Sequence, residues 1–492
     1  MNAAVHEVIV IGSGFGGSTV AAKLVDAGIH VTLLERGPWR NSGAVEAAKI
    51  DNAAPFPEGK QFFSHALRRI SAPLLPKGRA NLHRDGLFDL HYDRSLSILC
   101  SSSVGGGSHV YSAMNVAPRK NYWAAHHGAL SDDIMAPHYQ WILDTMGSQT
   151  AAASGSDTPN DICQDEQRPD WMQVDPDAQP KMGFRFNKST FTNNSFFGSS
   201  NNNKVSLDER LLIPRLGKGL SVLDRHEVLN ISRHINGLPA SPCSNAFRIT
   251  VKDHRSGNIR TLISAKIILA AGTLNTLKLL FSSRAENGLN GMPALGLGIG
   301  GNGDVPAYWP CNDRARDFST GAPCHGRFYL HDDPQRTNLT RYGINGVDGI
   351  PMPSALRKRL KQDLVLVGMG TDNANGIARW RKQKIQFEYL QAENPILNSI
   401  YNAFDKIGKL SGIRVWYTRR RPLTVHPYGG ARCGANIDNS VIDANGEVHD
   451  QPGLFIADAS ALPAAPGVPP SVTIAAWASH LAAAFITNHG AH

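Results

Sequence analysis

A glycine-rich turn between a short apolar strand and a helix constrains this chain more than any other feature. Residues 8–11 predict a buried strand, and Gly12, Gly14 and Gly17 follow it with the spacing GxGxxG. The first glycine permits a tight turn, the second lets a pyrophosphate approach, and the third lets the helix pack closely on the strand. Together with Gly16, these residues predict the dinucleotide-binding turn of a Rossmann-like unit.

An acidic residue stands where such a unit needs one. The second predicted strand, residues 31–34, ends at Glu35, 18 positions after Gly17. A carboxylate there suits both hydroxyls of an adenosine ribose, and the helix N-terminus between the strands attracts phosphates. Arg36 is a further predicted cofactor contact. The motif alone leaves NAD and FAD as alternatives.

Chain length and net charge limit the number of domains and the classes of binding partner. A chain of 492 residues predicts two closely joined domains. The net charge is +9, and the basic runs at 357–359, 379–384 and 419–421 predict solvated surface, with contact to an anionic substrate or a peripheral membrane surface as the alternative. No nucleic-acid-binding motif accompanies the charge, so we expect no nucleic acid partner.

Cysteine spacing and the N-terminus point to a cellular compartment. The cysteines show no CxxC or His-paired spacing, which predicts reduced thiols and no metal site; they are Cys100, Cys163, Cys243, Cys311, Cys324 and Cys433. The first strand begins within about eight residues of Met1, too early for a signal peptide. No apolar run approaches the ~20 residues of a transmembrane segment. We therefore expect a soluble, cytoplasmic protein.

Two kinds of pattern alternate along the chain. Strand and helix patterns of a parallel sheet recur at 220–223, 246–251, 266–272, 276–280, 453–458 and 472–483. Residues 150–204 read as long surface loops, whereas 362–368 and 384–389 alternate polar and apolar residues, as antiparallel strands do. A helix pattern covers 395–409.

These patterns predict a mixed α/β fold with a Rossmann-like domain built on a parallel sheet and a substrate domain built on a mostly antiparallel sheet. The dinucleotide-binding domain is assigned to residues 1–45, 205–296 and 426–492. The substrate domain is assigned to 46–204 and 297–425, with a cofactor-contacting loop at 100–116.

Further segments carry a family resemblance. They are Val104-Gly-Gly-Gly-Ser108 with Met114-Asn115, Lys266 to Thr276, His426-Pro-Tyr-Gly-Gly430, and Leu454 to Pro463 followed by Gly467 to Ile474. In this order, and with the N-terminal motif, they resemble the glucose–methanol–choline (GMC) flavin oxidoreductases, and most of all the cholesterol-oxidase branch. The resemblance implies FAD as the cofactor, and we expect it to be bound non-covalently.

The resemblance also implies cofactor-binding residues. Gly105, Gly106 and Gly107 lack Cβ atoms, so their backbone can lie against the flavin ring and direct N–H groups to it. Asp458 resembles the family acid beside the ribityl and phosphate groups, and Val228 resembles an adenine contact, although ordinary core packing explains Val228 nearly as well. The remaining implied contacts are Ser108, Tyr111, Asn115, Gly272 and Pro470.

His426 resembles the active-site histidine of the family, placed at flavin N5. Alcohol oxidation removes a proton from oxygen and a hydride from carbon, and an imidazole of near-neutral pKa suits the proton transfer. Tyr428 is a candidate for a hydrogen bond to substrate, although packing is the safer interpretation. Asp348, three residues before Pro351-Met-Pro353, resembles the carboxylate base of the cholesterol-oxidase branch, with turn formation as the alternative.

The chain departs from the family at two positions. Pro469 stands where relatives have Asn or His, and Tyr111 stands where they have Asn. Proline offers no donor to a substrate oxygen. His109 lies one position before the histidine of family members with covalent flavin.

The favoured function is FAD-dependent hydride removal from an apolar secondary alcohol, sterol-like or natural-product-like, with O2 or another electron acceptor. The alternatives are a flavin-dependent desaturase, isomerase or other oxidative tailoring enzyme, and a flavoprotein that only binds its ligand. The expected active-site residues are His426, Asp348, Tyr428 and Pro469.

Overall fold

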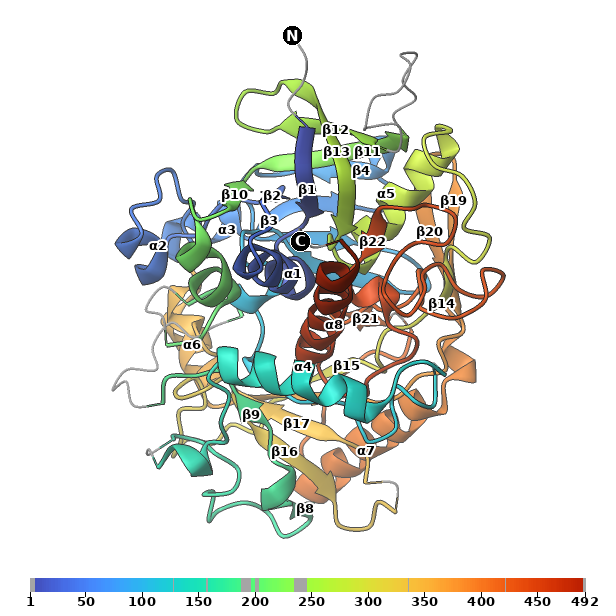
Figure 1. Ribbon diagram of the computed structural model, residues 1–492. Helices are drawn as coiled ribbons and strands as arrows, with labels where there is room; N and C mark the ends of the chain where they lie inside the picture. Colours follow the sequence, from blue (N-terminus) through green and yellow to red (C-terminus); the bar gives the residue numbers. More distant parts are fainter. Residues whose placement is uncertain are drawn as a thin grey trace, which may run out of the picture.

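Two sheet-based parts make up the fold in the computed structural model (Figure 1). The structure describes residues 5–126, 128–155, 158–186, 196–199, 203–233, 246–334, 336–420 and 422–489. Cys243, Arg421 and the Asn-rich stretches at 193–195 and 201–202 lie outside these residues.

The first part is built on a seven-stranded sheet. Its strands run in the order β10 (Leu220–Leu223), β2 (Val31–Leu34), β1 (Val5–Ile11), β13 (Ile259–Leu269), β12 (Phe247–Asp253) and β11 (His226–Arg233), and β22 (Leu454–Ile456) also pairs with β13. Pairing is parallel from β10 to β13 and for β22, and antiparallel for β12 and β11. The parallel strands bring their carboxyl ends to one edge, where ligands bind in such sheets.

Helices cover both faces of this sheet. Val8 and Val10 of β1 share a core cluster with residues of α1 (Phe15–Asp26) and α8 (Ser471–His489), which lie side by side in Figure 1. Ile9 and Ile11 point the other way and belong to the cluster that contains Leu277 of α5 (Thr273–Ala285). This double burial explains why β1 reads as an uninterrupted apolar run.

The second part contains three larger sheets and one strand pair. One sheet is antiparallel, in the order β15 (Val305–Trp309), β18 (Leu364–Gly368), β17 (Leu339–Tyr342), β16 (Cys324–Leu330) and β8 (Met172–Gln173). A mixed sheet has the order β21 (Leu423–Thr424), β6 (Ser97–Ser101), β5 (Phe88–His91), β3 (Leu67–Ser71) and β4 (Arg79–Asn81). The rest are β14 (Leu297–Ile299), β19 (Gly376–Arg381) and β20 (Lys384–Glu388), and the pair β7 (Met114–Asn115) and β9 (Lys181–Met182).

Further helices pack around these sheets. They are α2 (Gly43–Ala47), α3 (Phe62–His65), α4 (Asp132–Thr145), α6 (Ser354–Lys361) and α7 (Pro395–Ser411). In Figure 1, α4 passes the end of α8 between the two parts, and α7 lies on the outside of the second part. In the part of the chain that the structure describes, no helix combines the length and apolar character that a membrane crossing needs.

The predicted fold class is confirmed: a Rossmann-like parallel sheet is joined to a part with mostly antiparallel strands. All strands of the first sheet fall in the ranges assigned to the dinucleotide-binding domain, while the exact domain boundaries stay a prediction. The stretch at 150–204 differs from a purely surface loop, because Met182 and Phe184 are buried in a core cluster with Met114.

Candidate functional site

A cavity of about 1330 Å³ runs from the carboxyl edge of the first sheet to the strands of the second part. Its wall includes the glycine turn after β1 at one end and His426 at the other. A cavity of this size between two domains is the usual location of a cofactor and its substrate.

The glycine turn has the shape that its sequence predicts. A Cβ atom on Gly12, which has φ = +99°, would lie 2.3 Å from the Ala270 carbonyl oxygen, and one on Gly17 would lie 1.9 Å from that of Gly12. A Cβ on Gly16 would lie 2.0 Å from the Ala457 carbonyl oxygen. These glycines therefore allow close packing of α1 and the neighbouring strands.

Gly14 lines the cavity and, unlike the other glycines of the turn, is not required for close packing of the helix. A Cβ atom there would meet no described atom within 4 Å, and Gly14 lines the cavity. Gly14 is also the N-cap of α1 and has no side chain to accept hydrogen bonds from the first-turn N–H groups. The turn thus leaves both space and donors for a phosphate group.

The Glu35 carboxylate lines the cavity beside this turn. One oxygen accepts hydrogen bonds from the Ser13 backbone N–H (3.1 Å) and hydroxyl (2.7 Å), and the other accepts one from the Gly37 N–H (2.8 Å). Burial raises the pKa of Glu35, while these hydrogen bonds favour the ionised form. The position and charge fit a ribose with two free hydroxyls.

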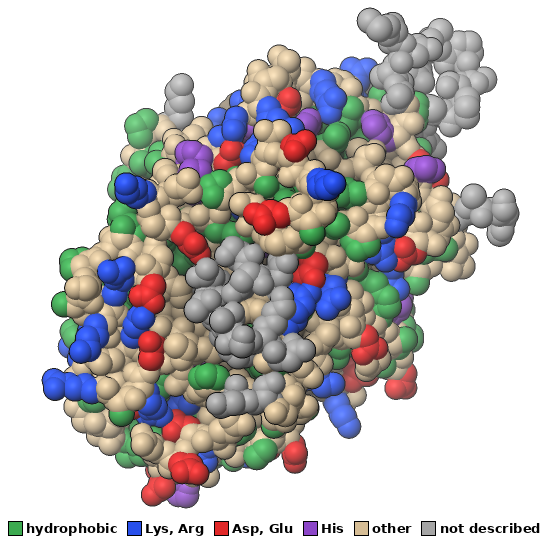
Figure 2. Space-filling view, turned by 90° about the vertical axis from the view of Figure 1, so that its left-hand side faces the viewer, with side chains coloured by type: hydrophobic (Ala, Val, Ile, Leu, Met, Phe, Trp, Pro, Cys, Tyr) green, Lys and Arg blue, Asp and Glu red, His purple; other side chains and the backbone are tan. Residues whose placement is uncertain are grey.

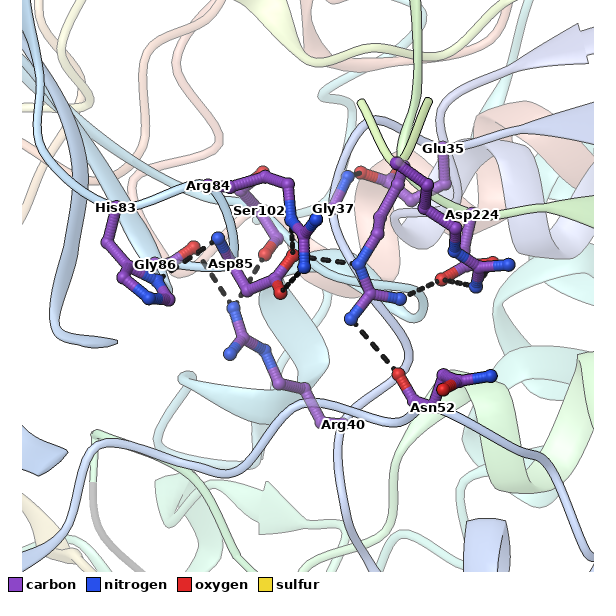
Figure 3. A network of polar contacts seen from close by, with 12 residues as sticks. Glu35, Gly37, Arg40, Asn52, His83, Arg84, Asp85, Gly86, Ser102 and Asp224 are labelled. Atoms are coloured by element: carbon purple, nitrogen blue, oxygen red, sulfur yellow. Dashed lines mark hydrogen bonds and ion pairs between the residues drawn. The ribbon is translucent and has the colours of Figure 1, made fainter. Parts of the chain in front are cut away.

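Buried ion pairs hold the segment that carries Glu35 (Figure 3). Arg225 donates to Asp85 (2.7 Å) and Asp224 (2.6 Å), and its backbone N–H donates to the Gly37 carbonyl (3.0 Å). Arg40, fully buried nearby, donates to the carbonyls of Gly86 and Ser102, each at 3.0 Å. Burial lowers the pKa of Arg40 to about 9. The sequence analysis did not identify this network, because its members are scattered and carry no motif.

Arg36 lines the cavity next to Glu35, as expected of a cofactor contact. Its guanidinium forms an ion pair with Asp89 (2.7 Å) and donates to the side-chain oxygen of Asn275 on α5 (2.9 Å). The side chain therefore bridges the mixed sheet and α5 across the cavity wall. Val228 lines the same end of the cavity, at a register shift in β11.

The loop Gly105–Gly107 packs against the glycine turn. A Cβ on Gly106 would lie 2.6 Å from the Gly14 Cα, and both Gly106 and Gly107 line the cavity. Gly105 faces the opposite side, where a Cβ would lie 2.9 Å from the His109 ring. The predicted flavin-contacting strip therefore consists of two of the three glycines.

Three residues predicted to contact the cofactor lie outside the described cavity lining and pack against neighbouring parts of the chain. Gly17 contacts Gly12, the Ser108 hydroxyl donates to the Gly105 carbonyl (2.7 Å), and the Asn115 side-chain amide donates to the Ser148 hydroxyl (2.8 Å). None belongs to the cavity lining formed by the described residues. Ser108 and Asn115 are therefore placed as structural support, whereas Gly17 has the packing role that its motif predicts. Each is involved in local backbone or side-chain packing.

His109 also faces away from the cavity. Its Nε2 lies 2.8 Å from the Val104 carbonyl oxygen and 3.4 Å from an Asp208 carboxylate oxygen, and its side chain is 3% exposed. This geometry gives the imidazole no access to the cavity wall.

Asp458 shapes the edge of the first sheet. Its carboxylate accepts hydrogen bonds from the backbone N–H groups of Gly272 and Ser460, each at 2.9 Å, and from the Thr276 hydroxyl. Burial raises the pKa of Asp458, and these donors oppose the rise. Asp458, Gly272 and Pro470 all line the cavity, and their contact with the cofactor stays a prediction.

His426 and Asp304 form a hydrogen-bonded pair in the cavity wall. Nδ1 of His426 lies 3.0 Å from one Asp304 carboxylate oxygen and 2.9 Å from the other. Asp304 also accepts a hydrogen bond from the Thr424 hydroxyl (2.7 Å), which in turn accepts one from the His426 backbone N–H (2.8 Å). An ionised carboxylate only accepts, so Nδ1 of neutral His426 carries the proton and Nε2 is the basic nitrogen.

Asp304 was missed by the sequence analysis. It lies 122 positions before His426, at the end of the turn Gly300-Gly-Asn-Gly-Asp304, and is 7% exposed. The only available signal was an acid that closes a glycine-rich turn before a strand, and that pattern also occurs in ordinary turns.

Asp348 is a correction to the predicted active site. Its side chain is 68% exposed and forms an ion pair with Lys361 of α6 (2.6 Å). It lies on the short turn Val347–Gly349, outside the cavity wall as described. The acid and the following Pro-Met-Pro element match the family pattern in spacing, but the turn directs the carboxylate to α6.

The two tyrosines considered for substrate contact have other partners. The Tyr111 ring lines the cavity, but its hydroxyl donates to the Val205 carbonyl (3.0 Å). Tyr428 is fully buried, donates to Asp372 and is absent from the cavity lining that the structure describes. This placement agrees with the packing interpretation of Tyr428 and corrects its inclusion among the substrate-contacting residues. Pro469 does line the cavity.

Apolar side chains line the cavity near Asp304, because Val365 and Val367 of β18 belong to the lining and β18 pairs with β15. Further apolar lining residues are Met114, Phe196, Met369, Val425 and Ile474. Such a wall favours an apolar ligand and keeps water from a reacting group.

Family models match both ends of the chain. The model described as GMC oxidoreductase matches residues 382–478, which include His426, Asp458 and Pro469. A model described as an NAD(P)-binding Rossmann-like domain matches residues 10–68, which include the glycine turn and Glu35.

Curated relatives match along nearly the whole chain. A cholesterol oxidase of Mycobacterium tuberculosis (strain ATCC 25618 / H37Rv) is 25% identical over 565 residues, with 97% of this chain and 90% of the relative covered. A cholesterol oxidase of Acinetobacter baumannii is 22% identical, with coverage of 96% and 93%.

Solved structures share the fold. The pyridoxine 4-oxidase from Mesorbium loti has a TM-score of 0.59 at 16% identity, with 99% of this chain and 100% of that chain covered. A fungal aryl-alcohol oxidase has a TM-score of 0.61 at 13% identity, with coverage of 98% and 99%.

Proposed function

This chain belongs to the GMC oxidoreductase family and is an FAD-dependent oxidoreductase, and on that premise we propose that it oxidises an apolar secondary alcohol with His426 as the base. The His426–Asp304 pair in the wall of a cavity that also has apolar lining residues from β18 is the observation that carries the proposal. The names of the relatives support it, since cholesterol oxidase and aryl-alcohol oxidase are alcohol-oxidising enzymes by name.

The residues of the cavity fit FAD, and we assign each a part of it. Gly14 and the N-terminus of α1 hold the pyrophosphate, and Glu35 holds the adenosine ribose. Val228 lies at the adenine end, and the Gly106–Gly107 backbone supports the flavin ring. Because His109 has no access to the cavity wall, the binding is non-covalent in this proposal.

Bound FAD supplies an acceptor for the two electrons and the hydrogen that leave the substrate carbon as a hydride. The chain supplies the proton transfer. Nε2 of His426 takes the proton of the alcohol oxygen, and the Asp304 carboxylate stabilises the imidazolium that forms. The electrons would pass from bound FAD to O2 or another electron acceptor.

The lack of a free hydrogen-bond donor among Pro469, Tyr111 and Tyr428 supports a second candidate reaction class. Pro469 has no donor, and the hydroxyls of Tyr111 and Tyr428 are engaged by Val205 and Asp372. The missing donor at a developing oxyanion weakens alcohol oxidation by about 10²–10³-fold relative to a site that has one. A desaturase, isomerase or other oxidative tailoring reaction on an apolar ligand is therefore the second candidate.

Anaerobic mixing tests the proposal. The FAD-loaded protein is combined with a panel of apolar secondary alcohols and, separately, with the matching ketones, and the flavin absorbance near its visible maximum is followed. Bleaching by alcohols supports the proposal, and bleaching by ketones alone supports the second candidate. His426→Gln should retain FAD and lose the bleaching by alcohols; if this variant bleaches as fast as the unmodified protein, His426 is not the base.

A further inference from the structure

A buried carboxylate connects the two chain segments that carry the His426–Asp304 pair. Asp372 follows β18 and is 3% exposed. It accepts hydrogen bonds from the Tyr428 hydroxyl, from the Gly301 backbone N–H (2.8 Å) and from the Tyr389 hydroxyl (2.8 Å). Gly301 lies three residues before Asp304, and Tyr428 lies two residues after His426.

Backbone contacts join the same two segments directly. Gly300 and Tyr428 exchange two N–H to carbonyl hydrogen bonds, each 3.1 Å long. A Cβ on Gly300 would lie 2.3 Å from the Tyr428 ring, so the segments are in close contact. The Thr424 hydroxyl contacts the Gly301 carbonyl (3.0 Å) as well as Asp304.

The loop that contains Gly301 also reaches the segment with Pro469. The Asn302 side chain donates to the Val468 carbonyl (3.0 Å) and accepts from the Gly467 N–H (2.9 Å). A shift of this loop would therefore move both sides of the reacting end of the cavity.

We propose that Tyr428 and Asp372 act as positioning residues, which keep the Asp304 carboxylate on Nδ1 of His426 by fixing the 300–304 loop against the 426–430 segment. The proposal rests on the function proposed above for His426. Neither side chain touches the cavity as described, so both act through the His426–Asp304 pair. Burial raises the pKa of Asp372, and the hydrogen bonds from Tyr428, Gly301 and Tyr389 oppose the rise.

The chain offers a matched control for this role. Tyr389 is also buried (6% exposed) and donates to the same carboxylate, but it follows β20, and that segment carries neither His426 nor Asp304. Tyr428→Phe and Tyr389→Phe each remove one phenol donor from Asp372. A purely structural role for the cluster predicts similar effects of the two changes.

The first readout needs no substrate. In FAD-loaded protein with 15N-labelled histidine, the His426 signals are assigned with His426→Gln, and the tautomer of the neutral ring is read from the nitrogen shifts. We expect one tautomer with the proton on Nδ1 in the unmodified protein and in Tyr389→Phe, and a mixture of tautomers in Tyr428→Phe. Unchanged tautomers in Tyr428→Phe overturn the proposal.

The second readout is the rate of anaerobic flavin bleaching by a substrate alcohol. We expect Tyr428→Phe to slow bleaching at saturating alcohol by about ten-fold or more, with a smaller change in KM, and Tyr389→Phe to slow it at least several-fold less. Equal losses in both variants overturn the positioning role.

If Tyr428→Phe does not fold, Asp372→Asn is the second variant, because it keeps the size of the side chain and weakens the same hydrogen-bonded connection. We expect the same mixture of His426 tautomers in this variant. A single tautomer there counts against the proposal. Failure of every alcohol to bleach the flavin refutes the proposed function, whereas the tautomer comparison still decides the role of Tyr428.

Discussion

Replacing Asp304 by Asn tests the assignment of His426 as a base. The carboxylate accepts from His426 Nδ1, the Thr424 hydroxyl and, at 3.3 Å, the Val425 N–H. The amide of Asn has one oxygen and one NH2 group. If the oxygen keeps the contacts with Thr424 and Val425, the NH2 group faces Nδ1, which must then accept, so the proton moves to Nε2. His426 in that tautomer cannot take the proton of an alcohol.

The expected loss is large. A carboxylate that fixes the tautomer of a catalytic histidine contributes about 10²–10⁴-fold to the rate, or about 3–5 kcal/mol of transition-state stabilisation. We therefore expect Asp304→Asn to slow anaerobic flavin bleaching by that factor with little loss of FAD affinity. Stopped-flow absorbance at saturating alcohol measures the rate, and flavin content per protein measures cofactor binding.

A matched variant separates this effect from general destabilisation. Asp363 is fully buried, accepts hydrogen bonds from Tyr308 and Arg359, and is absent from the described cavity lining. Asp363→Asn should lower the melting temperature but keep the bleaching rate of the folded enzyme within a few-fold. A bleaching rate for Asp304→Asn within three-fold of the unmodified protein (roughly 0.6 kcal/mol) would refute the tautomer argument.

Three further predictions concern the cofactor, the substrate and pH. Gly14→Val should leave the melting temperature of the apoprotein nearly unchanged, because no described atom lies within 4 Å of the new Cβ and φ is −72°. The same change should weaken FAD binding about ten-fold or more in a fluorescence titration. Gly12→Ala should instead destabilise the fold, because φ is +99° and the new Cβ would lie 2.3 Å from a carbonyl oxygen. Pro469→Asn adds a donor to the cavity wall and should raise the rate of alcohol oxidation, so a fall in the rate argues for the second reaction class. Burial lowers the pKa of His91 and of His138 to about 4, so the unfolded chain binds protons first as the pH falls, and stability present above pH 6.5 is lost between about 6.5 and 4. The well-buried His91 contributes a slope of up to about 1.4 kcal/mol per pH unit, and the more exposed His138 contributes less. His91→Phe should therefore flatten the melting-temperature profile in that range, and an unchanged profile contradicts the assignment.

The sequence predicted the parts of the site that lie next to each other in the chain. The turn Gly12–Gly17 and Glu35 belong to one βαβ unit, whose geometry follows from spacing alone. His426 and Asp458 were reached only through the resemblance to a family, because a single histidine or aspartate has no spacing pattern of its own. The strand pattern at 362–368 predicted β18 with the correct end and a start two residues early, since alternation of burial is a local property.

Contacts between distant segments escaped the sequence analysis. Asp304 reaches His426 only because the 300–304 loop pairs with Tyr428, and that pairing depends on the packing of a glycine without a Cβ against a tyrosine ring. Asp348 shows the opposite error: its spacing before Pro351 suggested a base, but the ion pair with Lys361 directs it to α6. Side-chain direction at a turn is set by tertiary packing, which spacing along the chain does not contain.

A crystal structure of the FAD-bound protein tests the central claim most directly. The account predicts the pyrophosphate at Gly14, the ribose hydroxyls on Glu35, and the reactive edge of the flavin ring facing Nε2 of His426, with Nδ1 still on Asp304. A flavin ring held elsewhere, with His426 out of reach of its reactive edge, would contradict the account.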